Sequence, residues 1–282
     1  MPVKTRKQIL ANWEEALLKS GVDSPRLSAQ VLLAHVLGLS RLDMLLDATA
    51  LVDEPARARM DFLGLRRMRG EPVAYLVGSK EFYGFSFQVG PGVLIPRPET
   101  ELLLDLMQER FKSDAALSVL DLGTGSGALA VSCAKLFPCA RVVAVDVSQK
   151  AIQIARHNAG AHGVLGQTAF VRGDLVSALR LSSFDVVLAN LPYVPLSIKP
   201  ALSREVLEFE PEVALFSGQD GMDCYRSLAL GVSGKMKSGA VLFCEIDGSQ
   251  GEAMNVLFSP LAQSVRIVKD YAGLDRVAVV VF

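Results

Sequence analysis

A polar residue, a rigid bend and an aromatic ring follow one another in Asn190-Leu191-Pro192-Tyr193. They come directly after Phe184–Ala189, an apolar run that predicts a buried strand, which Pro192 must end because proline cannot donate to a sheet ladder. The Asn190 side-chain oxygen and the Leu191 carbonyl can accept hydrogen bonds from an amino group, and the Tyr193 ring can pack on a flat π-system. The stretch predicts a site for a planar amide or amino group. A strand-ending turn with a capping Asn and a core Tyr explains the four residues equally well.

A second stretch, Gly123-Thr124-Gly125-Ser126-Gly127, lies between the apolar run Ser118–Leu122 and the start of a helix. Glycines let the backbone turn tightly and let a ligand approach it closely. Asp146 ends the next apolar strand, where a carboxylate can accept hydrogen bonds from a ribose diol. Together these features predict a nucleoside-bearing cofactor over the first two strands of a sheet.

The glycine spacing distinguishes two classes of cofactor. Nicotinamide enzymes carry GxGxxG, in which helix amides face a pyrophosphate, whereas this turn reads GxGxG. Asp121 precedes the turn, and its carboxylate suits the ammonium of an amino-acid tail, as in S-adenosylmethionine, better than a pyrophosphate. Asp174, after the third strand, is placed to meet an adenine amino group. The predicted cofactor-binding residues are Asp121, Gly123, Thr124, Gly125, Ser126, Gly127, Asp146, Asp174, Leu175 and Asn190.

Two prolines flank Arg97 and hold its backbone extended. Pro98 is well placed as the first residue of a helix that runs to about Phe111. The segment is either a stiff start to that helix or a rigid arm that holds Arg97 and Glu99 at a site.

Apolar strands alternate with helical stretches from Leu117 onward, which predicts a mostly parallel α/β sheet covered on both faces. Only the loop Asp270–Asp275 joins the last two strands, so the sheet should end in an antiparallel hairpin. The predicted strands are Ser118–Leu122, Arg141–Val147, Ala169–Val171, Phe184–Ala189, Ala240–Ile246, Val265–Lys269 and Arg276–Phe282.

The N-terminal part predicts a small all-α bundle, because capped helical patterns follow one another up to Arg69-Gly70. It carries no catalytic constellation, and Arg66, Arg67 and Arg69 are expected on a solvated face. The alternating aromatics of Glu81–Val89 predict a β-hairpin. We therefore expect a helical domain over residues 1–78, a hairpin linker over 79–95 and an α/β domain over 96–282.

The charge balance and the cysteine content indicate which partners and ligands the protein should lack. The 29 basic side chains balance 30 acidic ones, so no overall field attracts nucleic acid or an acidic membrane. The four cysteines form no CxxC pair, and we expect no metal site. The chain start lacks the apolar core of a signal peptide, and no apolar run reaches the length of a membrane span. These features predict a soluble cytoplasmic protein.

Several stretches together resemble the peptide chain release factor glutamine methyltransferases, the PrmC/HemK family. The stretches that carry the resemblance are 69–76, 81–84, 94–101, 121–127 and Phe209-Glu210-Pro211. The most specific is Ile95-Pro96-Arg97-Pro98-Glu99-Thr100-Glu101. One departure is Leu191, where the family usually has Pro. Asn-Leu-Pro-Tyr is familiar from ribosomal RNA adenine dimethyltransferases, but the 94–101 arm does not belong to those enzymes.

The resemblance implies a Rossmann-like, seven-stranded class I methyltransferase domain. Such an enzyme transfers a methyl group from S-adenosylmethionine to the side-chain amide of the GGQ-motif glutamine of release factors, and leaves S-adenosylhomocysteine. The helical domain would recognise the substrate, and a monomer is expected. The alternatives are methylation of an RNA or DNA adenine or of another protein glutamine, such as one in a ribosomal protein, and a nicotinamide oxidoreductase. The catalytic residues implied are Asn190, Leu191, Pro192 and Tyr193, which with Arg97 and Glu99 would also bind substrate.

Overall fold

The computed structural model describes residues 4–177 and 179–282, and in it the chain divides into two compact units. The first unit holds the chain up to Ser79 together with Ser203–Phe209. The second holds Lys80–Leu202 and Glu210–Phe282. The segment 203–209 therefore belongs to the helical unit, although it lies far along the chain from Ser79.

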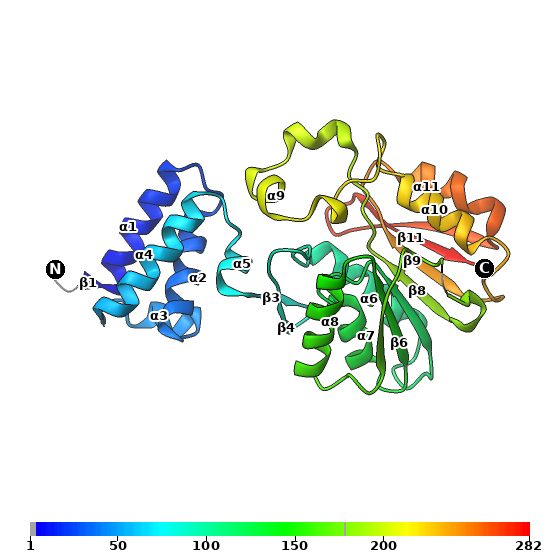
Figure 1. Cartoon of the computed structure of the whole chain (residues 1–282), viewed down its shortest axis with the longest axis horizontal. Helices are drawn as coiled ribbons and strands as arrows, with labels where there is room; N and C mark the ends of the chain where they lie inside the picture. The colour runs from blue at the N-terminus through cyan, green and yellow to red at the C-terminus, as the bar shows by residue number, and fades with distance from the viewer. Residues whose placement is uncertain (1–3, 178) are drawn as a thin grey trace. The chain divides into compact units, whose positions relative to one another are not determined.

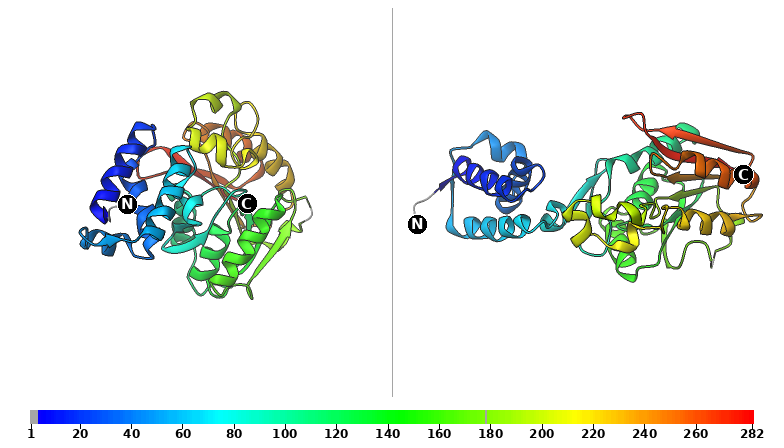
Figure 2. Two further views of the ribbon diagram at one scale, coloured as in Figure 1. Left: turned by 60° about the vertical axis from the view of Figure 1, so that its left-hand side comes forward. Right: turned by 90° about the horizontal axis from the view of Figure 1, so that it is seen from above.

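The helical unit is a bundle in which α1, α2 and α4 lie side by side (Figures 1 and 2). Its helices begin at side-chain caps in several places: Thr5 forms a capping box with Gln8, and Asp53 Oδ1 accepts from the Ala56 N–H at 2.8 Å. Leu32, Leu33, Met44 and Met60, for example, are fully buried in its core. Its elements are β1 (Lys4–Thr5), α1 (Arg6–Lys19), α2 (Pro25–Leu37), α3 (Arg41–Leu46), β2 (Leu51–Val52), α4 (Glu54–Met68), α5 (Val73–Val77) and α9 (Arg204–Phe209).

Arg67 ties α9 into this unit. Its side chain is buried, and Nη1 lies 2.6 Å from Glu205 Oε2 and 2.9 Å from the Glu71 carbonyl oxygen. Its Nε donates to Ser28 Oγ at 3.3 Å. A buried guanidinium needs such partners, because an unpaired buried charge is strongly destabilising. The prediction that Arg67 lies on a solvated face is therefore wrong.

The second unit is built on a mixed sheet (Figure 1). In the described residues this sheet has seven strands, in the order β10-β11-β9-β8-β5-β6-β7. Strands β5 to β9 are parallel, and β11 runs antiparallel to both β9 and β10. The sheet confirms the predicted fold class, with strand ends shifted by one or two residues. The strands are β5 (Ser118–Leu122), β6 (Arg141–Asp146), β7 (Thr168–Arg172), β8 (Val186–Ala189), β9 (Val241–Glu245), β10 (Ser264–Lys269) and β11 (Asp275–Val281).

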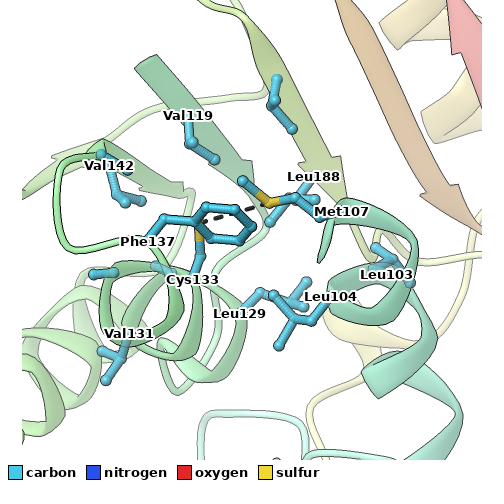
Figure 3. Packing of buried hydrophobic residues seen from close by; sticks show 14 of the residues in the cluster. Leu103, Leu104, Met107, Val119, Leu129, Val131, Cys133, Phe137, Val142 and Leu188 are labelled. Carbon is cyan, nitrogen blue, oxygen red and sulfur yellow. Dashed lines mark hydrogen bonds between the residues drawn. The ribbon is translucent and has the colours of Figure 1, made fainter. Parts of the chain in front are cut away.

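Both faces of the sheet are covered. Successive strand residues point to opposite faces, so Val119 packs under α6 (Leu102–Arg110), α7 (Ala128–Leu136) and α8 (Gln149–Ala161). Leu120 packs under α10 (Asp223–Val232) and α11 (Gly251–Phe258) on the other face. Figure 3 shows the first layer, in which Met107 of α6 meets Cys133 of α7 with sulfur atoms 3.8 Å apart. The strands and the loops that follow them are thereby held in place by a close-packed core on each face of the sheet.

The sheet has a topological switch point at β5. The chain passes from β5 to β6 and β7 on one side, and then returns to place β8 on the other side of β5. In open α/β sheets a crevice forms at the carboxyl ends of the strands at such a point. The loops that begin at Gly123 and Asn190 therefore meet there.

Two shorter features precede the sheet. The predicted hairpin consists of β3 (Ser79–Phe82) and β4 (Phe85–Gln88), with positive φ at both turn residues, Tyr83 and Gly84. The helix expected from Pro98 begins instead as a 3-10 turn, η1 (Pro98–Glu101), and becomes α6 only at Leu102. Across residues 4–177 and 179–282, no helix is both long enough and apolar enough to cross a bilayer.

Candidate active site

A cavity of about 420 Å³ opens at the switch point, and all its lining residues belong to the second unit. This volume lies within the range of small-molecule sites. Ten of the predicted site residues line it, and they come from the ends of β5, β6, β7 and β8. They are Gly123, Thr124, Gly125, Ser126, Asp146, Asp174, Leu175, Asn190, Leu191 and Pro192.

The glycine-rich turn needs its glycines for two reasons. Gly123 and Gly127 have φ values of 70° and 82°, in the left-handed region. A Cβ on Gly127 would lie 3.0 Å from Ala155 of α8, and one on Gly123 would lie 3.2 Å from Leu191 Cδ2. Asn158, also on α8, supports the turn by donating to the Ser126 carbonyl at 2.8 Å.

Asp146 joins this turn to the loop after β6. Its Oδ2 accepts from the Gly125 N–H at 2.9 Å, and its Oδ1 accepts from the Ser148 N–H at 2.8 Å. Burial raises the pKa of Asp146, and the two backbone donors oppose that rise. The carboxylate lines the cavity with further lone pairs free, as binding of a ribose diol requires.

Asp121 lies behind the turn and does not line the cavity. It is fully buried, and Oδ2 accepts from the Thr124 hydroxyl at 2.6 Å and from the Ala130 N–H at 3.2 Å. Its Oδ1 has no hydrogen-bond partner within the described residues. Burial raises the pKa of Asp121 to about 7. A buried carboxylate with one unpartnered oxygen fits the predicted neighbourhood of a cation.

The raised pKa of Asp121 gives a prediction for stability. The folded protein holds the proton more tightly than the unfolded chain, so stability without cofactor should fall as pH rises from about 4 through about 7, by a few kcal/mol. Asp121→Asn cannot ionise, so its thermal midpoint should fall less than that of the wild type between about pH 5 and about pH 8. Calorimetric melting of both proteins checks this. A wild-type midpoint that rises over this interval relative to the variant would contradict it.

Asn190 presents its two amide ends differently. Its Nδ2 donates to Thr100 Oγ1 at 2.9 Å. No donor in the described part of the chain reaches its Oδ1, and the Leu191 N–H makes no hydrogen bond there either. The Leu191 side chain is buried over Gly123. The oxygen end of Asn190 is thus available to a ligand in the cavity.

Tyr193 is placed differently from the predicted stacking position, because it does not line the cavity. Its hydroxyl donates to Glu245 Oε1 at 3.0 Å, and its carbonyl oxygen accepts from Gln250 Nε2 at 3.0 Å. Burial, followed by the Glu245 charge, raises its pKa. In this structure Tyr193 braces the turn after β8.

In the structure Arg97 is paired with a carboxylate from a distant segment of the same unit. Arg97 Nη2 lies 2.5 Å from Oε1 of Glu210, and Glu210 Oε2 accepts from the Ile95 N–H at 3.1 Å. Glu210 is buried, whereas Glu99 is exposed. Neither Arg97 nor Glu99 lines the cavity.

Sequence reasoning missed several residues that build the site. Glu245 is a buried acid at the carboxyl end of apolar β9, and the rule that selected Asp146 would have found it. Thr100 and Gln250 carry no such signal, since their roles depend on partners far along the chain. The cavity wall also includes Pro211, from a stretch that carried the family resemblance, and Val213, Ala214 and Phe216, which no chemical pattern marks.

Comparison with known proteins identifies the family. Residues 8–78 match the family model of the PrmC N-terminal domain, and residues 98–207 match that of the methyltransferase small domain. The release factor glutamine methyltransferase of Nitratidesulfovibrio vulgaris is 40% identical over 277 residues, which cover 96% of this chain and 93% of that protein. The chain belongs to the release factor glutamine methyltransferase family. The family member from Neisseria gonorrhoeae is 40% identical over 257 residues, 90% of this chain and 92% of its own.

Solved structures agree with this family at the level of the fold. A Pyrococcus furiosus methyltransferase aligns with a TM-score of 0.53 and 16% identity, over 82% of this chain and 98% of its own. The T. thermophilus 16S rRNA N2 G1207 methyltransferase, solved with AdoMet and guanosine, gives a TM-score of 0.53 and 21% identity. The alignment covers 72% of this chain and 49% of that one. These structures show the fold alone, and the relatives named above confirm the predicted membership of the release factor methyltransferase family.

Proposed function

We propose that this enzyme transfers a methyl group from S-adenosylmethionine to the side-chain amide nitrogen of the GGQ-motif glutamine of peptide chain release factors. Two relatives that match this chain over 93% and 90% of their own length are named release factor glutamine methyltransferase. The observation that carries the chemistry is the Asn190 amide at the cavity, whose oxygen has no protein donor among the described residues. An acceptor at this place suits an incoming NH2 group.

The residues of the cavity fit the cofactor. S-adenosylmethionine supplies an electrophilic methyl group on a positively charged sulfur, together with an ammonium, a ribose diol and an adenine. Asp146 would accept from the diol, and exposed Asp174 would meet the adenine amino group with Leu175 beside it. The unpartnered oxygen of Asp121, behind Thr124, supports a cation near the glycine turn.

The chain's own part in the reaction is orientation. An amide nitrogen is a poor nucleophile, because its lone pair is delocalised into the carbonyl. The Asn190 oxygen and the Leu191 carbonyl would accept the two amide hydrogens, which aligns the nitrogen and stabilises positive charge that develops on it. Pro192 lines the cavity beside them and would pack on the amide plane. A contact of Tyr193, Arg97 or Glu99 with substrate stays a prediction.

The test is mass spectrometry of a release factor after incubation with this protein and S-adenosylmethionine. One methyl group should appear on the peptide that contains the GGQ glutamine. A release factor with that glutamine replaced by alanine is the control and should stay unmodified. Methylation at another residue, or of RNA instead, would contradict the proposal.

We assign substrate recognition to the predicted helical domain, residues 1–78, since it carries large exposed apolar side chains. Leu42 and Leu46 of α3 are 66% and 75% exposed. The double variant Leu42→Asp, Leu46→Asp should lower kcat/KM for intact release factor about tenfold, because an unpaired carboxylate is costly to bury in an apolar contact. The kcat/KM for a short peptide that contains the acceptor glutamine should not change. Monomeric state and cytoplasmic location also stay predictions.

Leu230 supplies the matched control for this pair, since it is 79% exposed on α10 of the other unit. Leu230→Asp should change neither rate. If the α3 double variant lowered kcat/KM equally for intact release factor and for the peptide, its effect would be on catalysis and not on recognition of the protein.

A further inference from the structure

We propose that Glu210 is a positioning residue, which keeps Asn190 in place through the segment 94–101. This role rests on the proposed function, in which the Asn190 oxygen accepts from the substrate amide. It deepens that function, because it gives two stretches that carry the family resemblance a shared part in aligning the acceptor nitrogen. Those stretches are the segment 94–101 and Phe209-Glu210-Pro211.

Glu210 joins two parts of the cavity wall. Its side chain is buried, and both of its oxygens have partners on the segment 94–101. Oε1 lies 2.5 Å from Arg97 Nη2, and Oε2 accepts from the Ile95 N–H at 3.1 Å. The residues on either side of Ile95 line the cavity, and so does Pro211 directly after Glu210. Because an unpaired buried charge is strongly destabilising, this carboxylate holds the two parts of the wall together.

The segment 94–101 extends this constraint to Asn190. Arg97 lies between two prolines and has an extended backbone, which restricts how far the segment can bend. Its carbonyl oxygen accepts from the Thr100 N–H at 3.2 Å within η1. Thr100 Oγ1 in turn accepts from Asn190 Nδ2 at 2.9 Å. A continuous series of contacts therefore runs from Glu210 to the amide that would orient the substrate.

A third link closes these contacts into a ring. The Val194 N–H donates to the Leu215 carbonyl at 2.9 Å, and the Ser217 N–H donates to the Val194 carbonyl at 3.1 Å. These bonds tie the loop that begins at Glu210 to the turn that begins at Asn190. Three segments that line the cavity are thus linked in pairs. The Glu210 link joins charged groups, and such hydrogen bonds are about twice as strong as neutral ones, so its loss should loosen the ring most.

The experiment compares Glu210→Ala, which loses both contacts, with Glu210→Gln, which keeps an oxygen for the Ile95 N–H but loses the charge opposite Arg97. Methylation of intact release factor is followed by mass spectrometry at saturating S-adenosylmethionine and saturating release factor. Because a displacement of about 1 Å can cost about 100-fold in rate, a loosened segment should lower kcat about tenfold in Glu210→Ala and about threefold in Glu210→Gln. An unchanged kcat in Glu210→Ala would overturn the proposal.

The deciding measurement repeats Glu210→Ala in an Asn190→Ala background under single-turnover conditions. If Glu210 acts through Asn190, its replacement should change the rate there by less than about twofold, because the two effects are then coupled and do not add. A role in stability alone would lower the rate by the same factor in both backgrounds, and that result would also overturn the proposal. Circular dichroism checks that each variant folds, and Glu210→Gln takes the place of Glu210→Ala in the comparison if the alanine variant does not.

Asp185→Asn is the matched control. Asp185 also accepts from a backbone N–H, that of Ser118 at 2.8 Å, and also pairs with a cation, Lys237. It precedes β8, so it lies at the opposite end of that strand from Asn190. Its replacement should lower the thermal midpoint and leave kcat unchanged, and a loss of kcat as large as that of Glu210→Ala would contradict the proposal. Failure of the proposed function would show differently, as a wild-type protein that methylates no release factor.

Discussion

Replacing Asn190 with alanine should lower the turnover of release factor about 100-fold or more, as for loss of one preorganised polar partner of a transition state. The variant loses the only side-chain acceptor that we assign to the substrate amide. It keeps the glycine turn and Asp146, which hold each other through the Gly125 N–H. Affinity for S-adenosylmethionine should therefore change much less than turnover. Initial rates at saturating cofactor, together with calorimetric titration, separate the two effects.

Leu191→Pro is the matched control for this experiment. It keeps the carbonyl that would accept the second amide hydrogen, and it removes an N–H that makes no hydrogen bond within the described residues. A proline there also matches the usual sequence of the family, so activity should stay within a few-fold of the wild type. If Leu191→Pro abolished activity while Asn190→Ala spared it, residues 190–193 would be a strand-ending turn that does not orient the substrate amide.

The second large effect is expected for Asp146→Ala, which should weaken S-adenosylmethionine binding by ~1.5–3 kcal/mol. That loss corresponds to about 10- to 150-fold in Kd. The physical reason is the loss of charge-assisted hydrogen bonds from a half-buried carboxylate that lines the cavity. Calorimetric titration measures it directly.

Asp146 also accepts from Gly125 and Ser148, so the alanine variant loses some order in both loops. Asp146→Asn retains one acceptor oxygen for these N–H groups and should bind the cofactor with intermediate affinity. Thermal melting of both variants shows how much of the loss is structural. Unchanged affinity in Asp146→Ala would remove this residue from the cofactor site.

The amino-acid sequence by itself determined the sheet, the N-terminal helices and the strand ends that meet at the cavity. Hydrophobic runs of strand length report burial on both faces, and consecutive parallel strands bring their carboxyl ends to one edge. Polar residues directly after such runs, such as Asp146 and Asn190, must therefore lie close together. This reasoning needs only local patterns, so it located ten of the residues that line the cavity.

Only the tertiary structure decided what those side chains bind. Thr100 meets Asn190 across 90 positions of sequence, and Glu210 reaches Ile95 across 115. Arg97 is drawn to Glu210, and Tyr193 turns to Glu245 instead of the cavity. Local sequence patterns report whether a residue is buried, but which buried donor faces which acceptor depends on how distant elements pack. For the same reason the segment 203–209, which no pattern separates from its neighbours, joins the helical unit through Arg67 and Glu205.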